Sequence, residues 1–227
     1  MKKYLPTILV VAAILVVVGF VVWALMRPDQ SASPTSKELS AEDKIAITQG
    51  NSQGKQDSAV VLTEFGDYQC PACGQWYPFL HDTLLPAYAD KIKFVFKNYP
   101  LTNLHKNAMV AAQAAEAAAL QGKFWEMHDK LYQTQQDWSN DSNDQAKSKF
   151  EGYARELGLD TDRWKKDFDS DKVKTVIKAD MALGDKLGLP GTPSFLINGQ
   201  VVDTKNGFED LKNALDKALA ASQQSSQ

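Results

Sequence analysis

The sequence predicts an α/β fold in which a block of helices interrupts a small sheet, preceded by a membrane-spanning helix. Strand-like runs of β-branched and aromatic residues occur at both ends of the folded part, and residues 102–187 between them carry an almost unbroken helical pattern. The third observation is an uncharged stretch near the N-terminus that is long enough to cross a bilayer. Together these features predict one exported α/β domain held on a tether.

The first 27 residues differ in character from the rest. No residue from Leu5 to Met26 is charged, and a helix of that length spans roughly 33 Å, which is enough for the hydrocarbon core of a membrane. The stretch is longer than the apolar region of an ordinary signal peptide, which favours an uncleaved anchor over a cleaved signal or a buried core helix. Lys2 and Lys3 precede it, so the positive-inside rule predicts a cytoplasmic N-terminus and an extracytoplasmic remainder.

Residues 28–57 are rich in Ser, Gln, Asp, Gly and Pro, and we expect a flexible linker there. The alternative is that part of this segment pairs with the sheet as an extra edge strand. At the other end of the chain, residues 223–227 are predicted to form a disordered tail.

The folded part begins, in residues 58–101, with a βαβ unit. The runs "SAVVLTEF" (58–65) and "KIKFVFKNY" (91–99) have the length and composition of strands. The stretch between them, opened by Pro71, is long enough for a crossover helix.

Residues 102–187 follow as a block of helices. An alanine-rich run has high helix propensity and stops at Gly122, which suits a helix C-terminus. Later segments place apolar residues at spacings of three and four, which is typical of amphipathic helices: "FWEMHDKLYQTQQ", "AKSKFEGYARELG", "DTDRWKKDF" and "DKVKTVIKADMALGDKLG".

Strand patterns return in residues 188–222. The run "TPSFLING" is followed by "QVVDT", and Asn198-Gly199 between them is the two-residue signature of a type I′ hairpin. An amphipathic helix, "NGFEDLKNALDKALAA", closes the domain.

Composition limits the function classes. The chain is 44% hydrophobic and 23% charged, which is ordinary for a globular protein, and its formal net charge is −3. No basic stripe interleaved with aromatic residues occurs, so the sequence argues against nucleic-acid binding.

Cys70 and Cys73 are the only cysteines of the chain and stand in the stretch "DYQCPACGQW". A disulfide between them closes too small a loop to constrain the unfolded chain much, so a structural staple explains the pair poorly. If a helix begins here, Cys70 lies at its N-cap and Pro71 in its first turn. The free N–H groups at the helix start would then favour the Cys70 thiolate and make it a ready nucleophile, with Cys73 as the shielded resolving thiol.

A metal site is the main alternative for a C-x-x-C pair. Zinc would need two more ligands from His81, His105, His128 or carboxylates, and the chain has no second cysteine pair. We therefore expect no metal, and we expect the three histidines to lie on the surface or in helix packing. Trp76, close after the motif, is expected in the helix core, with the rim of the site as the alternative.

With these motifs the sequence resembles the DsbA-like branch of the thioredoxin superfamily, and most closely its membrane-tethered members in layout. The resemblance rests on "EFGDYQCPACGQW" and "GLPGTPSFLING", on the strand order and on the helical block, and it covers roughly residues 58–220. It implies a thioredoxin fold whose two parts, 58–101 and 188–222, are separated by a helical insertion at 102–187.

The resemblance also implies the site residues. Cys70 would be the exposed nucleophile and Cys73 its partner, and their redox-active disulfide would serve without any separate cofactor. Pro193 matches the cis-proline beside the active site of this superfamily, with Thr192 before it as a substrate-binding position. Glu64 stands where these proteins often carry an acid beneath the second cysteine. If buried, its raised pKa would let it accept the Cys73 proton; the alternative is an exposed glutamate at a strand end.

The implied function is an exported thiol–disulfide oxidoreductase that donates the Cys70–Cys73 disulfide to thiols of newly exported polypeptides. The implied re-oxidant is a quinone-linked membrane oxidase of the DsbB or VKOR kind. One departure is Ala72, where DsbA itself has a histidine that stabilises the thiolate, so we expect a weaker oxidant than DsbA. A reductase or isomerase working from the dithiol form, and a tethered chaperone without chemistry, are the alternatives.

Overall fold

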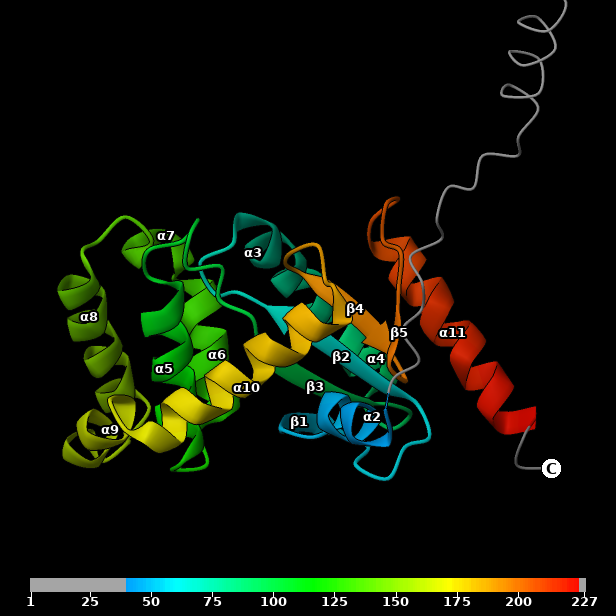
Figure 1. Cartoon of the computed structure of the whole chain (residues 1–227), viewed down its shortest axis with the longest axis horizontal. Coiled ribbons are helices and arrows are strands. Elements are labelled where there is room, and N and C mark those ends of the chain that lie inside the picture. Colours follow the sequence, from blue (N-terminus) through cyan, green and yellow to red (C-terminus); the bar gives the residue numbers. More distant parts are fainter. Residues whose placement is uncertain (1–39, 225–227) are drawn as a thin grey trace, which may run out of the picture. The chain divides into compact units, whose positions relative to one another are not determined.

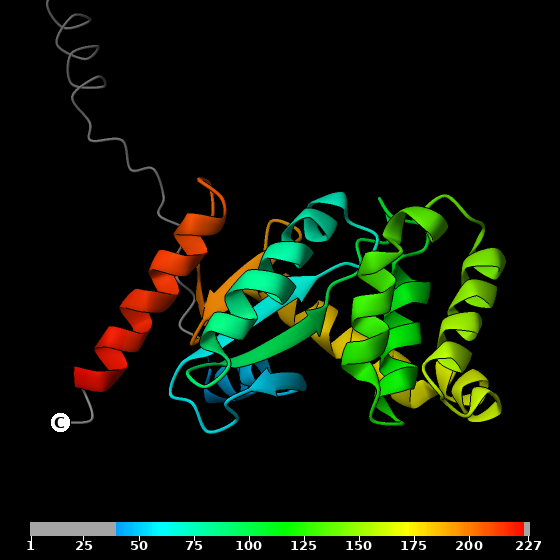
Figure 2. The same cartoon turned by 180° about the vertical axis from the view of Figure 1, so that it is seen from behind.

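The computed structural model describes residues 40–224, which Figures 1 and 2 show from opposite sides. The expected membrane-spanning helix (1–27) and the first part of the expected linker (28–39) lie outside the described residues, as do residues 225–227 of the expected tail. The expectation of a disordered tail is wrong for residues 223 and 224, which continue the last helix. Within residues 40–224, no helix combines the length and the apolar character needed to cross a membrane.

A five-stranded sheet forms the centre of the domain, in the order β1-β3-β2-β4-β5 (Figure 1). β2 and β3 run parallel and every other neighbouring pair is antiparallel. A parallel pair needs a crossover, and the predicted helix after Cys70 supplies it. The strands are β1 (Asn51–Gly54), β2 (Val61–Gly66), β3 (Lys93–Asn98), β4 (Ser194–Ile197) and β5 (Gln200–Val201).

One face of the sheet is covered by the crossover helix and by α11 (Phe208–Gln224) (Figure 2). The crossover consists of α3 (Pro71–Pro78), a π-helical segment η1 (Phe79–Leu84) and α4 (Leu85–Tyr88). Its buried leucines pack with those of α11 against apolar residues of β2, β3 and β4. Residues Leu62, Glu64 and Gly66 of β2 share this face, because side chains alternate along a strand.

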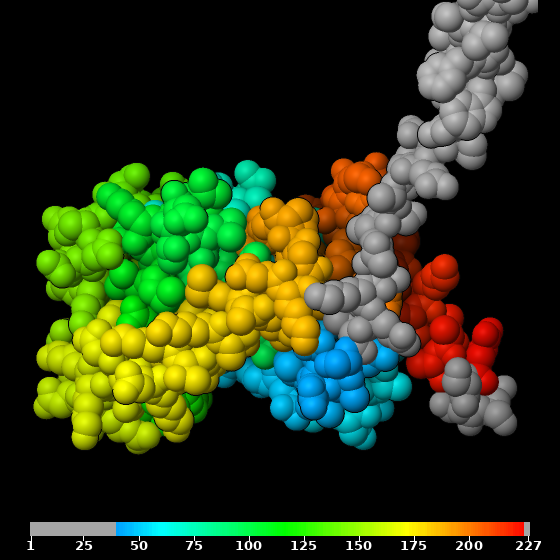
Figure 3. All heavy atoms as spheres, viewed as in Figure 1, coloured from blue at the N-terminus to red at the C-terminus, as the bar shows by residue number. Residues whose placement is uncertain are grey.

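The opposite face is covered by α2 (Ala41–Thr48) and α10 (Asp171–Leu187), which lie side by side in Figure 3. Ile47 and Leu183 pack there against Phe65 of β2 and Leu196 of β4. The central strands are therefore buried on both sides, which agrees with their nearly continuous apolar sequence.

The helical insertion packs around α5 (Ala108–Ala119), whose alanines are almost all buried. Small side chains let the neighbouring helices approach closely, and large residues between them, among them Trp138, Phe150 and Trp164, fill the core. The remaining helices are α6 (Phe124–Gln133), α7 (Gln135–Trp138), α8 (Asn143–Glu156) and α9 (Thr161–Phe168). The predicted helical run from 102 to 187 is confirmed.

Local signals set the element ends. Ser142 begins α8 with a capping box, and Asp160 caps α9. α10 ends at Gly188, whose φ of 66° is the left-handed conformation that glycine adopts without strain. Asn198 and Gly199 both have positive φ, at 49° and 82°, so the predicted type I′ hairpin is confirmed.

The expectation of a flexible linker up to residue 57 is wrong for residues 41–54. Ser40 caps α2 through a capping box with Asp43, and Ile47 is fully buried. β1 then pairs antiparallel with β3, from Asn51 opposite Phe96 to Gly54 opposite Lys93. Polar residues that resemble a tether in composition therefore serve as a helix cap and an edge strand. The edge strand is the alternative weighed for this segment, whereas helix α2 was not expected.

Replacing Ile47 with alanine tests whether α2 is an integral part of the domain. The side chain is 0% exposed, and truncating a buried isoleucine costs about 2–5 kcal/mol through lost burial and the cavity left behind. We expect the free energy of unfolding to fall by that amount in denaturant titrations. Ile45, on the same helix but 53% exposed, is the matched control, and Ile45→Ala should change stability by less than about 0.5 kcal/mol. Equal effects of the two variants would contradict the docking of α2.

Candidate active site

The cysteine pair lies at the start of α3. Cys70 is the N-cap residue, with extended backbone angles (φ −65°, ψ 123°), and Pro71 occupies the first turn. The backbone N–H of Cys70 donates to the carbonyl oxygen of Asp67 at 3.0 Å. The carbonyl oxygen of Cys70 accepts from the backbone N–H of Gly74 at 3.1 Å, which is the first hydrogen bond of the helix. Proline costs nothing here because the first N–H groups of a helix lack intrahelical partners anyway. The predicted placement of Cys70 and Pro71 is confirmed.

The two sulfur atoms differ in access. Both cysteines are free thiols in this structure; Cys70 is 7% exposed and Cys73 only 1%. The Cys70 thiol donates to the carbonyl oxygen of Thr192, with an S···O distance of 3.4 Å. The following Thr192–Pro193 peptide bond is cis, as the resemblance to the thioredoxin superfamily implies. The loop before β4 therefore lies directly against the Cys70 sulfur. At 7% exposure Cys70 is buried, so the expectation of an exposed nucleophile is wrong, although Cys70 is the less buried of the two cysteines.

The surroundings of Cys70 stabilise its thiolate and lower its pKa to about 5. The largest contribution is a hydrogen bond donated by the Cys73 thiol, followed among the favourable ones by the side chain of Thr192 and the backbone of Cys73 and Ala72; burial opposes them. The sequence predicts a lowered pKa from the helix start. The structure adds the hydrogen bond from the Cys73 thiol, which is the largest single contribution.

Cys73 has the opposite tendency. Burial raises its pKa well above the ordinary value. The hydrogen bond that its thiol donates to Cys70 raises the pKa further, and so do the nearby charges of Glu64 and Cys70. One thiol of the pair is thus ionised at neutral pH and the other keeps its proton. This asymmetry suits an exchange reaction in which one sulfur is attacked and the other leaves or resolves.

Glu64 lies in the middle of β2, opposite Phe96 of β3 and Phe195 of β4. It is 2% exposed, so the alternative of an exposed glutamate at the strand end is wrong. Burial, with a smaller contribution from the charge on Cys70, raises the pKa of its carboxyl to about 8. The charge of Glu64 in turn helps to raise the pKa of the buried Cys73 thiol.

A second buried acid, Asp67, fixes the loop before Cys70. Its carboxylate accepts hydrogen bonds from the backbone N–H groups of Gln69 (2.7 Å) and Leu101 (2.9 Å), and its Oδ2 lies 2.7 Å from Nδ1 of His105. These contacts join the loop to the segment after β3. The sequence analysis expected His105 on the surface or in helix packing and did not single out Asp67, although Asp67 stands inside the motif "EFGDYQCPACGQW".

Gln135 of α7 holds the same loop from the helical insertion. Its side-chain amide donates to the carbonyl oxygens of Tyr68 (2.8 Å) and Cys70 (2.9 Å). The insertion therefore positions the thiol site and does not merely cover it. Nothing in the sequence pattern around Gln135 predicts this contact, because it spans 65 residues or more.

The other residues singled out as possible ligands do not form a metal site. Residues 40–224 contain no group of three or more His, Cys, Asp or Glu side chains arranged to hold a metal ion. His81 lies at the surface of η1, and His128 is buried among aromatic rings of the insertion and the sheet. Trp76 packs against Phe195 and Phe208, partly buried, as expected for helix core.

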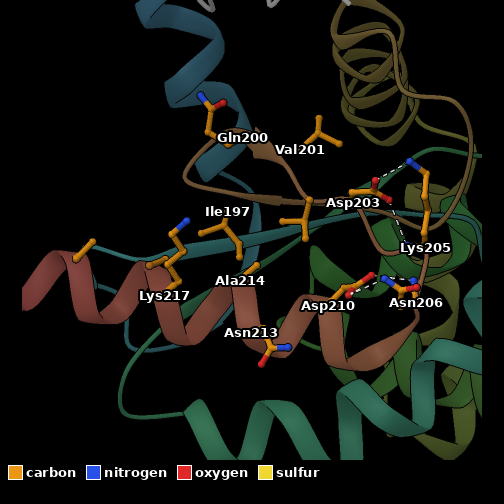
Figure 4. Close-up of a pocket in the computed structure, with 13 residues that line it drawn as sticks. Ile197, Gln200, Val201, Asp203, Lys205, Asn206, Asp210, Asn213, Ala214 and Lys217 are labelled. Carbon is orange, nitrogen blue, oxygen red and sulfur yellow. Dashed lines mark hydrogen bonds and ion pairs between the residues drawn. The ribbon is translucent and has the colours of Figure 1, made fainter. Parts of the chain in front are cut away.

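A separate groove of about 750 Å³ lies between the β5 hairpin and α11 (Figure 4). It is lined by apolar side chains such as Ile197 and Ala214 and by polar ones such as Asp210 and Lys217. Neither cysteine, Glu64 nor Thr192 lines it, so the groove is distinct from the thiol site.

The Cys70 pKa predicts how stability depends on pH. The folded state holds this pKa at about 5, below the ordinary thiol value of about 8.5, so the stabilisation is complete above about pH 8.5 and is lost as pH falls through 5. As pH rises across this window, the unfolding free energy of the reduced protein should increase relative to that of the disulfide form. The increase should be at most about 1.4 kcal/mol per pH unit. The raised pKa of Glu64 changes stability with pH in the opposite direction. Glu64 is present in both redox forms, so its contribution largely cancels in the difference between them.

Denaturant titrations of both redox forms across that pH range measure the difference. A difference in unfolding free energy that does not change with pH would contradict the lowered Cys70 pKa.

Comparisons with known proteins agree with this geometry. The thioredoxin family profile matches residues 47–217. The "Probable disulfide bond formation protein D" of Bacillus anthracis is 30% identical over 221 residues, which cover 91% of this chain and 92% of that protein. The "Na(+)/H(+) antiporter NhaA 1" of Salinispora arenicola is 35% identical over 168 residues, or 74% of this chain, but the match spans only 24% of the antiporter's length. A solved thioredoxin-like oxidoreductase from Silicibacter pomeroyi DSS-3 superposes with a TM-score of 0.64 at 28% identity, over 79% of this chain and 98% of that one.

Proposed function

The chain belongs to the thioredoxin family as a DsbA-like thiol–disulfide oxidoreductase, and from this premise we propose that it donates a Cys70–Cys73 disulfide to thiols of newly exported proteins. The observation that carries the proposal is the opposed ionisation of the two thiols, with the Cys70 pKa lowered to about 5 and the Cys73 pKa raised. A thiol of low pKa is a good leaving group, so a disulfide that contains it is readily given away.

The reaction proceeds by two sulfur exchanges. A substrate thiolate attacks Sγ of Cys70, the Cys70–Cys73 bond breaks, and Cys73 leaves and takes a proton. A second substrate thiolate then attacks the substrate sulfur of the mixed disulfide, and Cys70 leaves as a thiolate. The substrate loses two electrons and gains a disulfide, and the enzyme is left as the dithiol.

Glu64 is proposed as the group that exchanges the proton with Cys73. Its carboxyl has a pKa of about 8 and lies near a thiol that is 1% exposed. A protonated Glu64 can give its proton to the leaving Cys73 sulfur, and the carboxylate can take it back when the disulfide forms again. Without such a group, a bare thiolate would have to form in the protein interior, which burial makes unfavourable.

Thr192 and Pro193 are proposed to receive the substrate. The Thr192 carbonyl lies 3.4 Å from the Cys70 sulfur, and both residues are partly exposed. An extended substrate segment can pair with the backbone there and bring its thiolate to Cys70, with affinity from main-chain hydrogen bonds. Binding of this kind selects for unfolded chains and not for one sequence.

We further propose that the enzyme acts outside the cytoplasm and is anchored through residues 1–27. The name of the Bacillus anthracis relative supports a role in disulfide formation. The proposed re-oxidant is a quinone-linked membrane oxidase of the DsbB or VKOR kind, which would accept the two electrons of the dithiol. Anchoring both partners in one membrane would raise their effective concentration.

Trapping the thiols in living cells tests the direction of exchange. Cells that express the full chain are quenched with acid and alkylated, and the fractions of oxidised and reduced protein are read from the mass added. A mostly oxidised Cys70–Cys73 pair is expected for a disulfide donor. A mostly reduced pair would identify a reductase or isomerase, and full biological activity of Cys70→Ser would identify a chaperone without chemistry.

A further inference from the structure

The proposed function requires a proton to move between solvent and two buried groups, Cys73 and Glu64. Cys73 is 1% exposed and Glu64 is 2% exposed, yet in each cycle Cys73 gains a proton when the disulfide opens and loses it when the disulfide forms again. Glu64 can hold that proton but cannot pass it to solvent by itself. The question is which buried groups connect Glu64 with the surface.

A small cavity of about 10 Å³ lies beside Glu64. This is the space that one water molecule occupies, and a buried water needs two to four polar partners. The polar side chains that line it come from five elements: β1, β2, α3, η1 and α6. Glu64, His128 and Tyr132 lie at the buried end, and Tyr77, His81 and Asp129 lie toward the surface, together with Gln53 of β1. The cavity thus joins the sheet interior to the outer side of α6 and η1.

Two buried polar atoms in its lining are unsatisfied. Nε2 of His128 and the hydroxyl of Tyr132 have no hydrogen-bond partner among residues 40–224. Such atoms are rare in folded proteins and call for a physical reason. A Cβ on Gly66 would lie 3.1 Å from the Tyr132 hydroxyl, so this hydroxyl lies against β2 on the face that also carries Glu64.

On its outer side His128 is connected to the surface. Its Nδ1 lies 3.0 Å from Oδ1 of Asp129, and the Asp129 side chain is 28% exposed. Oδ2 of Asp129 lies 3.5 Å from Nε2 of His81, which is 44% exposed in the π-helical segment η1. π-helical turns in α-helices are frequently found at functional sites.

We propose that protons pass between Glu64 and solvent through a water in this cavity, His128 and Asp129. This path rests on the proposed function, since it serves the proton that Cys73 exchanges with Glu64. Tyr132 would orient the water through its hydroxyl. The titratable groups that face His128 are Glu64 of β2, Tyr68 of the loop before α3, Tyr77 of α3, His81 of η1, and Asp129 and Tyr132 of α6. β3 packs on the ring only through Phe96.

His128 can serve both directions because its two nitrogens face different partners. Burial lowers its pKa, so the ring rests neutral with one proton. When Nδ1 carries it, Nε2 accepts a proton from the cavity water while Nδ1 releases one to Asp129. When Nε2 carries it, Nδ1 accepts a proton from Asp129 while Nε2 releases one to the cavity water. Each catalytic cycle has one inward and one outward transfer, so the ring returns to its first tautomer without turning over.

Infrared spectroscopy of the full chain tests the path without relying on activity. At neutral pH Glu64 is mostly protonated, and its carboxylic C=O band shifts when the proton exchanges with deuterium from solvent. The Glu64→Gln variant identifies the band. We expect His128→Phe, which keeps a ring but removes both nitrogens, to slow the exchange by at least about tenfold relative to the unmodified chain, because proton relay groups typically contribute 10²–10⁴-fold.

Asp129→Asn, at a partly exposed side chain, removes the outer acceptor and should slow the exchange as well. Tyr68→Phe is the matched control for a buried unpartnered hydroxyl, since Tyr68 contacts the His128 ring but does not line the cavity; its exchange rate should be unchanged. Unchanged exchange in Asp129→Asn and in a folded His128→Phe would overturn the path, as would the absence of a Glu64 acid band. Disulfide donation by the unmodified chain in vitro is measured in parallel with the proton exchange. It shows whether the proposed function is correct independently of the proton path.

Discussion

Replacement of Cys70 by serine is expected to abolish disulfide donation. The rate at which the oxidised full chain introduces disulfides into a reduced, unfolded protein should fall by at least about 10³-fold, to the uncatalysed rate. A hydroxyl cannot form the mixed disulfide, and Cys73 cannot take over because it is 1% exposed and its pKa is raised. Stopped-flow assays or electrophoresis of the substrate's disulfide forms measure the loss.

Cys73→Ser separates loss of the disulfide from loss of the nucleophile. This variant also cannot donate a disulfide, but it keeps the thiolate at position 70, so a neutral alkylating reagent should still react with it quickly at a pH well below 8.5, the ordinary thiol pKa. Cys70→Ser should react slowly with the same reagent. Equal reactivity of the two variants, or donation by Cys70→Ser, would contradict the assigned roles.

Glu64→Gln is expected to slow the exchange by about 10²-fold, the lower end of what a positioned acid–base group contributes. The change keeps size and burial but removes the proton that Cys73 needs when it leaves. The pH profile gives the specific signature. Because the Glu64 pKa is about 8, the donation rate of the unmodified chain should decline as pH rises through 8, and this inflection should vanish in the variant.

Glu116→Gln is the matched control for this prediction. Glu116 is also buried, at 5% exposure, and its pKa is raised to about 7 by burial. Its carboxylate accepts from the side chains of Asn51 and Asn98, at 2.8 Å and 2.7 Å, and it is not part of the thiol site. Loss of rate in Glu116→Gln equal to that in Glu64→Gln would show that a buried charge in general, and not Glu64, affects the reaction.

The sequence was informative wherever local chemistry sets the structure. The position of Cys70 before Pro71 predicts the N-cap, and Asn198-Gly199 predicts the hairpin, because each depends on the backbone preferences of two adjacent residues. The helices of the insertion follow from apolar spacing and from capping residues such as Ser142. Glu64 was a correct candidate for a buried acid because it stands where the resemblance to the DsbA-like proteins implies one.

Features that depend on distant partners could not be read from the sequence. α2 and β1 contain too few apolar residues to stand out, and only docking of Ile47 and pairing with β3 order them. The hydrogen bond from Gln135 to the Cys70 carbonyl joins residues far apart in the chain, and no local sequence pattern predicts it. The same is true of His128, which was expected on the surface or in helix packing but which the fold brings together with Glu64 around one cavity.

Ionisation of Cys70 is the most direct measurement of the central claim. In the reduced full chain the thiolate of Cys70 absorbs in the ultraviolet, and Cys73 stays protonated over the range of interest because its pKa is raised. A pH titration of this absorbance should have its midpoint at about 5, and the Cys70→Ser variant should lack the transition. A midpoint near the ordinary thiol value of about 8.5 would contradict the account.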